Sequence, residues 1–229
     1  MTIPSCYHQE STSLLRMNKK PNPYKKRPVL IDNPAQFDQN NDYHEEIEFI
    51  NIDFDTVPID SRSFESCTFS SCRFFNMTLS ETAFRSCLFD KCELVLAKLH
   101  TVTLDAVLFR ACKIMGVNFS SCNDFGFMVD FSNCTINNSI FYGLNFKKRT
   151  ILECTIADSD LSDCDFTEAD FSDTHFKEVT VHNCNFEKAD FRSAIGYSIN
   201  PLTNQMRNAR FCLPEAQSFL PFLGIKLEL

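Results

Sequence analysis

The sequence contains no tryptophan and only five glycines among its 229 residues. So little glycine excludes collagen-like and glycine-rich chains, and 44% hydrophobic residues exclude a wholly disordered one. No apolar run approaches the roughly 20 residues of a membrane span, and residues 1–6 lack the charged start and apolar stretch of a signal peptide. Basic residues are outnumbered, with 22 Lys and Arg against 30 Asp and Glu. We therefore expect no direct binding to nucleic acid or to an anionic membrane.

Phenylalanine, in contrast, is abundant and periodic. Starting at Phe49, fifteen successive fifth positions hold a large apolar residue, and this run ends at Phe119. A second run of thirteen extends from Phe131 to Phe191, and Phe211 keeps the same phase. Of the 24 phenylalanines, 18 fall in this register, whereas chance would place about a fifth of them there. The chain is therefore built from an internal repeat of five residues.

A period of five fits neither a helix nor a strand, and it predicts a chain that turns a corner every five residues. Four sides close a square coil of twenty residues, so residues i and i+20 stack about 4.8 Å apart. We expect one column to contain Phe49, Phe69, Phe89 and Phe109. We expect a second column to contain Phe131, Ile151, Phe171, Phe191 and Phe211. Stability then comes from the stacking of neighbouring coils.

The position two before each large residue is small, and Asp or Asn often stands between them. Examples are Cys164-Asp165-Phe166, Ala169-Asp170-Phe171 and Ala189-Asp190-Phe191. With these units the chain resembles the pentapeptide-repeat family over residues 47–211. The resemblance implies an all-β fold, a right-handed quadrilateral parallel β-helix, with both the small and the large residue pointing inward. Arg62, Leu144 and Arg149 depart from the small residue. At these corners we expect local widening or an outward swing, because a buried unpaired guanidinium is costly.

The phase of the repeat slips between Phe119 and Phe131, which are twelve residues apart instead of ten. Residues 120–128 must absorb two extra residues, and Gly126 suits the unusual dihedral angles of a bulge. A packing irregularity is the preferred interpretation. A protruding recognition loop is the alternative.

The two ends lack the five-residue period and suggest three regions. Residues 1–44 are interpreted as a flexible N-terminal tail with a basic patch at residues 17–28. The tail could instead target the protein, touch nucleic acid, or lie along the coil and cover its first edge. Residues 45–211 form the β-helix, and residues 212–229 a C-terminal cap. In the cap, Pro214 and Glu215 begin a short helix that Pro221 should kink or end, and residues 224–229 alternate as a short strand.

The cap contains more apolar residues than one lid over one coil should need. We expect a homodimer whose interface contains Phe219, Leu220, Phe222, Leu223, Ile225 and Leu227. A cap that only covers the last coil is the alternative, since an open edge invites aggregation.

The residues offer little catalytic or metal-binding chemistry. Nine of the twelve cysteines occupy the small inward position, which predicts buried free thiols rather than disulfides or zinc ligands. His100, His175 and His182 flank inward residues and should point outward. There is no phosphate-binding loop and no nucleophile elbow. We expect no enzyme activity, no cofactor and no metal. Many free thiols favour a reducing compartment, so we expect the protein in a bacterial cytoplasm. A secreted effector is the alternative.

Acidic residues concentrate in one stretch. Residues 153–173 contain eight acidic residues and no basic one. The expected partner-binding residues are Asp158, Asp160, Asp163, Asp165, Glu168, Asp170 and Asp173. Some pentapeptide-repeat relatives bind bacterial type II topoisomerases by imitating DNA, so the resemblance implies a non-enzymatic protein-binding solenoid with DNA gyrase or topoisomerase IV as partner. The alternative is a structural scaffold or effector module with an unrelated protein partner.

Overall fold

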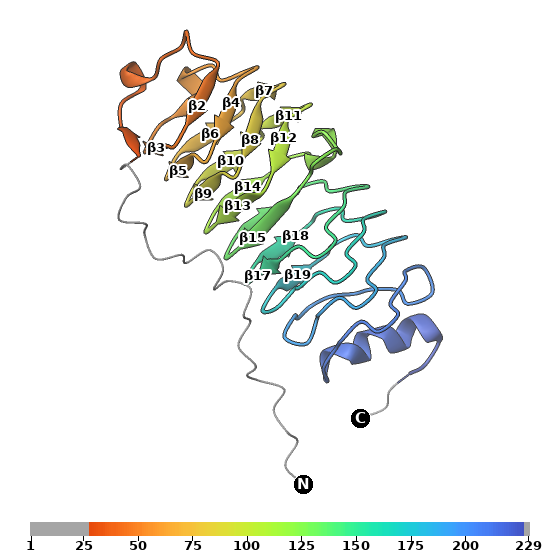
Figure 1. The fold of residues 1–229 in the computed structure, drawn as a ribbon. Helices are drawn as coiled ribbons and strands as arrows, with labels where there is room; N and C mark the ends of the chain where they lie inside the picture. The colour runs from red at the N-terminus through yellow and green to blue at the C-terminus, as the bar shows by residue number, and fades with distance from the viewer. Residues whose placement is uncertain (1–27, 227–229) are drawn as a thin grey trace, which may run out of the picture.

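The computed structural model describes residues 28–226, which form a four-sided parallel β-helix (Figure 1). Successive coils stack along one axis, so the short strands pair with strands of the neighbouring coils. The fold class predicted from the period is confirmed. Among the described residues, no helix is long and apolar enough to cross a membrane.

Four sheets make the sides of the coil, and all their strand pairs are parallel. The first contains, in spatial order, β1 (Val29–Ile31), β3 (Ile47–Ile50), β5 (Thr68–Ser70), β9 (Leu88–Asp90), β13 (Val107–Arg110), β15 (Val129–Ser132) and β17 (Ile151–Leu152). The second contains β6 (Arg73–Phe75), β10 (Glu93–Val95), β14 (Lys113–Met115), β16 (Thr135–Asn137), β18 (Thr155–Ala157) and β19 (His175–Lys177). The third pairs β7 (Thr78–Ser80) with β11 (Lys98–His100). The fourth contains β2 (Tyr43–Glu45), β4 (Ser63–Glu65), β8 (Ala83–Arg85) and β12 (Thr103–Asp105).

Towards the C-terminus the sides continue as isolated bridges rather than strands. Asp160 bridges Ile140 and Thr180, and Asp165 bridges Asn145 and Asn185, in each case twenty residues away. The twenty-residue coil therefore persists where regular strands do not. Three short 3-10 helices interrupt the coils, η2 (Pro34–Gln36), η3 (Phe54–Thr56) and η4 (Phe119–Ser121), and a longer one, η5 (Glu215–Leu223), follows the last coil.

The core is a ladder of stacked aromatic rings. Ring centroids are 4.9 Å apart for Phe49 and Phe69, 4.7 Å for Phe69 and Phe89, and 4.8 Å for Phe89 and Phe109. The ladder does not break at the phase slip, because Phe131 stacks on Phe109 at 5.4 Å. The two columns expected from the sequence are thus one column, and the prediction of two was wrong. The coil between them has 22 residues, and the extra length leaves the column undisturbed.

The extra residues are accommodated after η4. Phe127 remains buried and packs on Phe146 at 5.4 Å, whereas Phe125 is 96% exposed and Gly126 has a φ of 80°. The chain thus forms the bulge that the sequence predicted, with Gly126 in the left-handed region that favours glycine. No described contact assigns a function to Phe125.

The cysteines are core residues, as predicted. Ten described cysteines are buried free thiols, and Cys212 is half-buried. Several donate to a backbone carbonyl of the previous coil, for example Cys92 Sγ to Phe69 O at 3.1 Å and Cys184 Sγ to Leu161 O at 3.0 Å. Thr174 occupies an equivalent position and bonds Ile151 O at 2.6 Å. A small side chain with a donor therefore satisfies a carbonyl that faces the interior.

Three large residues occupy the position where the repeat has a small one, and the structure accommodates each of them differently. Leu144 is buried in the core, and Arg149 is partly exposed and pairs with Asp130 at 3.4 Å. Arg62 does not swing outward, since its side chain is only 10% exposed. Its guanidinium donates to Asn41 O at 2.6 Å and to the carbonyl of residue 39 at 2.8 Å. The expectation of an outward swing at Arg62 was wrong, because the preceding chain covers this side chain and supplies its acceptors.

That covering segment corrects the predicted boundary at residue 44. Strand β1 pairs with β3 and places Ile31 beside Phe49, while β2 pairs with β4. Residues 28–44 therefore lie along the first coil and cover its edge, which was the alternative to a flexible tail. The basic patch lies almost wholly in residues 1–27, outside the described residues.

At the other end, η5 packs across the last coil (Figure 1). Phe219 contacts Phe211 at 4.8 Å and Tyr197 at 5.8 Å between ring centroids. Pro221 lies inside η5, which continues to Leu223, so of the two expected effects of this proline, a kink or an end, the helix does not end there. Ile225 and Lys226 are in no strand, and the rest of the predicted strand lies outside the described residues.

Candidate partner-binding surface

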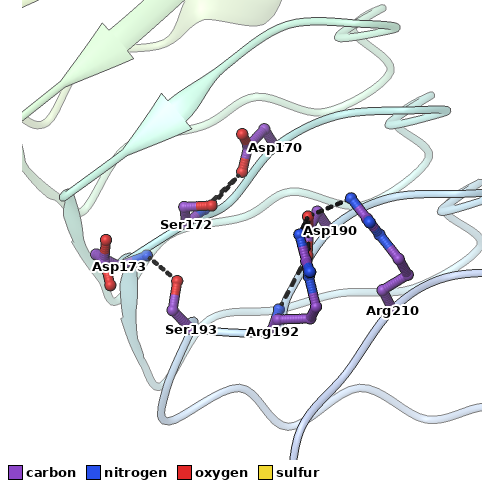
Figure 2. Close-up of polar contacts among 7 residues, drawn as sticks. All are labelled: Asp170, Ser172, Asp173, Asp190, Arg192, Ser193 and Arg210. Carbon is purple, nitrogen blue, oxygen red and sulfur yellow. Dashed lines mark hydrogen bonds and ion pairs between the residues drawn. The ribbon is translucent and has the colours of Figure 1, made fainter. Parts of the chain in front are cut away.

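The seven predicted partner-binding residues belong to one coil but differ in their surroundings. Asp160, Asp165 and Asp170 immediately precede an inward residue and serve the backbone. Their Oδ1 atoms accept the N–H groups of Ser162, Thr167 and Ser172, each at 2.9 Å. Figure 2 shows Asp170 also accepting the Ser172 hydroxyl, at 2.5 Å. These carboxylates stabilise turns as well as carrying charge.

The other four occupy successive corners of the coil. Asp158, Asp163, Glu168 and Asp173 have φ values of 50°, 59°, 59° and 57°. Residues five apart lie on adjacent sides of a four-sided coil, so these carboxylates are distributed around the axis. The sequence stretch forms an acidic ring rather than one acidic face. Only residues twenty apart can line up along the axis.

Basic residues of the neighbouring coils compensate part of this ring. Glu168 lies between Lys148 and Lys188, with N–O distances of 3.8 and 3.7 Å. One coil further on, Asp190 pairs with Arg192 at 2.8 Å and with Arg210 at 2.5 Å (Figure 2). The absence of basic residues from 153–173 in the sequence therefore does not translate into an uncompensated surface.

The remaining acidic charge gathers on one corner and the side that follows it. Asp158 and Glu178 occupy the same corner one coil apart, and both are exposed. With Asp160 they line an open depression whose other lining residues include Ile140. None of the three makes an ion pair among the described residues, although Lys177 lies next to Glu178 in the chain. We call Asp158, Asp160 and Glu178 the acidic depression.

Asp163 lies at the next corner and is held by polar neighbours. Asn183 Nδ2 donates to it at 2.5 Å, and the hydroxyl of Tyr142 also donates to it. The hydrogen bond to the Asp163 carboxylate raises the pKa of Tyr142 above its ordinary value. Two corners further on, Asp173 donates its backbone N–H to Ser193 Oγ at 2.9 Å (Figure 2).

Glu178 was not predicted from the sequence, because it lies outside the dense acidic stretch. Its position exactly one coil after Asp158 would have identified it, had the acidic residues been compared at a spacing of twenty.

The residues of the predicted dimer interface differ in how far the structure buries them. Phe219, Leu220 and Phe222 are half-buried, whereas Leu223 and Ile225 are 49% and 47% exposed. A shallow groove lies beside Leu220, Pro221 and Ile225. Leu227 lies outside the described residues. The cap therefore leaves apolar surface uncovered at the C-terminal end.

The described residues offer no arrangement of three or more His, Cys, Asp or Glu side chains suited to a metal ion. His100, His175 and His182 are exposed, as predicted. Burial raises the pKa of the Cys122 thiol to about 12 and that of Cys184 to about 11. These thiols stay protonated at neutral pH and are poor nucleophiles.

Two family models match the repeat region. One, described as a pentapeptide repeat region, matches residues 83–161, and another, described as pentapeptide repeats in eight copies, matches residues 156–194. The chain belongs to the pentapeptide-repeat family. No curated protein matches its sequence.

Solved structures with this fold extend the comparison. Two structures of trypsin-treated QnrB1, described as a plasmid-mediated fluoroquinolone resistance protein, align with TM-scores of 0.56 and 0.54. The first is 18% identical and covers 88% of this chain and 97% of its own. The second is 16% identical and covers 81% of this chain and 100% of its own. HetL, a pentapeptide-repeat protein involved in heterocyst differentiation regulation from the cyanobacterium Nostoc, aligns with a TM-score of 0.42 at 12% identity, over 88% of this chain and 92% of its own. For the two QnrB1 structures, the likeness at these identities is one of fold.

Proposed function

We propose that this repeat protein binds a protein partner through the acidic depression and the adjacent Asp163, and that the partner is a type II topoisomerase such as DNA gyrase. The observation that carries the proposal is the axial alignment of Asp158 and Glu178 beside Asp160, without cationic partners among the described residues. These carboxylates are available to a basic surface, whereas Glu168 already contacts two lysines.

Charge density limits what this surface imitates. A column of corner residues offers at most one charge per 4.8 Å of axis, whereas duplex DNA carries one per about 1.7 Å. The acidic depression is therefore a local epitope, and a duplex-like surface along the whole solenoid is not part of the proposal. Of the seven residues expected from the sequence, Asp158, Asp160 and Asp163 remain the main contacts, and Glu178 joins them.

The choice of partner draws on the comparisons. QnrB1 is described as a fluoroquinolone resistance protein, and fluoroquinolones act on type II topoisomerases. The shared fold supports a partner of this kind, and the acidic epitope suits a surface that normally holds DNA.

A supercoiling assay with purified gyrase tests the proposal, with and without a fluoroquinolone. We expect the wild-type protein to change gyrase activity or its inhibition by the drug. The variant Asp158→Asn, Asp163→Asn, Glu178→Gln should need at least tenfold more protein for the same effect, because its epitope is neutral. The control variant Asp60→Asn, Glu81→Gln, Glu93→Gln removes the same charge from other coils and should behave as wild type.

Indifference of gyrase to the wild-type protein would contradict the proposed partner and favour a scaffold with another partner. Equal potency of the two variants would show that overall charge, and not this epitope, drives the effect.

A further inference from the structure

A small cavity penetrates the core beside the acidic depression. It has a volume of about 60 Å³. Its walls include the side chains of Leu161, Phe171, Phe176, Val181, Phe186 and Phe191. It lies between the last coils before the C-terminal cap.

Two local changes in the repeat create this space. In one column, Phe141 and Leu161 are followed by the smaller Val181. In the neighbouring column, Phe176 is followed by Gly196, and the next residue, Tyr197, turns inward instead. A Cβ at Gly196 would lie 2.3 Å from Phe176 O, so the backbone approaches too closely there for any larger residue. The column therefore cannot be filled in the regular way.

Tyr197 is one of the residues that line the cavity. The residue is only 3% exposed, and its hydroxyl has no hydrogen-bond partner among the described residues. Desolvation raises the pKa of Tyr197, so the hydroxyl keeps its proton and can donate.

Glu178 joins the cavity to the surface. It is the residue that lines both the cavity and the acidic depression. An apolar group in the cavity would therefore continue into a segment that passes Asp158, Asp160 and Glu178. This arrangement suits an apolar anchor with positive charge beside it.

We propose that the cavity receives one methionine-sized apolar side chain from a basic segment of the protein partner. This inference rests on the proposed function and specifies its contact. A volume of about 60 Å³ is well under the 150 Å³ that admits benzene and suits about four non-hydrogen atoms. The aromatic rings of the cavity wall favour a thioether, because sulfur makes favourable contacts with aromatic rings.

Capped tripeptides test the proposal without any topoisomerase. Lys-Met-Lys, Lys-Gly-Lys and Glu-Met-Glu are titrated into the full-length protein while methyl resonances of Val181 and Leu161 are followed by NMR. We expect Lys-Met-Lys to shift these resonances in a saturable way. The other two should bind at least tenfold more weakly, because one lacks the anchor and the other carries the wrong charge.

Variants assign the effect to the cavity. Val181→Phe fills the space and should abolish binding of Lys-Met-Lys, followed on Leu161. Glu81→Gln with Glu93→Gln is the remote control and should bind as wild type. Thermal melting establishes that each variant is folded.

Equal shifts from all three peptides, or no shift at millimolar Lys-Met-Lys, would overturn the proposal on the wild-type protein alone. If Lys-Met-Lys binds as expected while gyrase does not respond to the protein, the proposed role of the cavity is supported and the proposed partner is wrong. If gyrase responds but no peptide binds, the proposed function stands and the cavity does not serve it.

Discussion

A residue's place in the five-residue period decides its burial, even where the residue is polar. His44 lies one step before Phe49 and is only 3% exposed. Its ring stacks 4.7 Å from Phe37 and 5.1 Å from Phe64. Its Nε2 has no hydrogen-bond partner among the described residues. Burial, with a smaller contribution from the Arg62 guanidinium, lowers the pKa of His44. The column that contains Phe64 therefore includes a neutral histidine stacked under Phe37, which the sequence analysis did not identify.

The change His44→Phe should stabilise the protein by about 1 kcal/mol at pH 7, because it removes an unsatisfied buried nitrogen and keeps the stacking. The lowered pKa means that the unfolded state binds the proton more readily. The wild type should therefore lose stability as pH falls below the ordinary histidine value of about 6.5. The variant should lack this part of the pH dependence. Urea unfolding at pH 7.5 and pH 5 measures both effects, and identical curves for the two proteins would contradict the assignment.

At the scale of elements, the first coil depends on the segment that covers it. Strand β1 pairs with β3, and Phe37 packs on Phe49 at 5.9 Å between ring centroids. The carbonyls of residues 39 and 41 accept hydrogen bonds from the Arg62 guanidinium. An uncovered edge would expose both an apolar end and a buried charge. Residues 28–44 therefore belong to the folded unit.

Two truncations test this boundary. A protein starting at residue 28 should unfold in urea at the same midpoint as the full chain. A protein starting at residue 45 should lose at least about 3 kcal/mol, because it exposes the first rings and leaves Arg62 without acceptors. Limited proteolysis provides a second measurement and should leave a resistant core that begins near residue 28. If the protein starting at residue 45 is as stable as the full chain, residues 28–44 are a tail and not part of the folded unit.

At the scale of the whole molecule, the two ends of the solenoid differ. The N-terminal end is covered by residues 28–44, whereas the C-terminal end leaves Leu223 and Ile225 about half exposed. We propose a symmetric dimer through this surface, in which the two solenoids extend in opposite directions. Each acidic ring would then lie about two coils from the joint. The two acidic depressions could contact one partner together.

Replacing Leu223 and Ile225 by Asp should convert this dimer to a monomer, because an apolar interface does not tolerate unpaired charge. Light scattering after size exclusion measures the mass directly. Leu96→Asp is a matched control, since Leu96 is 50% exposed on a remote corner and its change should leave the mass unaltered. A monomeric wild-type protein would contradict the proposed dimer.

The sequence by itself determined the inward and outward positions. A large residue at every fifth position, with a cysteine or alanine two before it, leaves a four-sided coil as the arrangement that buries both. The stacked phenylalanines, the buried thiols and the outward histidines all follow from this local rule, because burial depends only on the phase of the repeat.

Only the tertiary structure decided which residues are neighbours across coils. Lys148 and Lys188 neutralise Glu168 from twenty residues away in each direction, and Glu178 joins Asp158 in the same way. The 22-residue coil keeps Phe131 on Phe109, and the chain before β2 supplies acceptors to Arg62. The physical reason is that surface charge, cavities and covered ends depend on contacts between coils. Those contacts are set by how many residues each coil contains and by what packs on its ends, which a period of five does not specify.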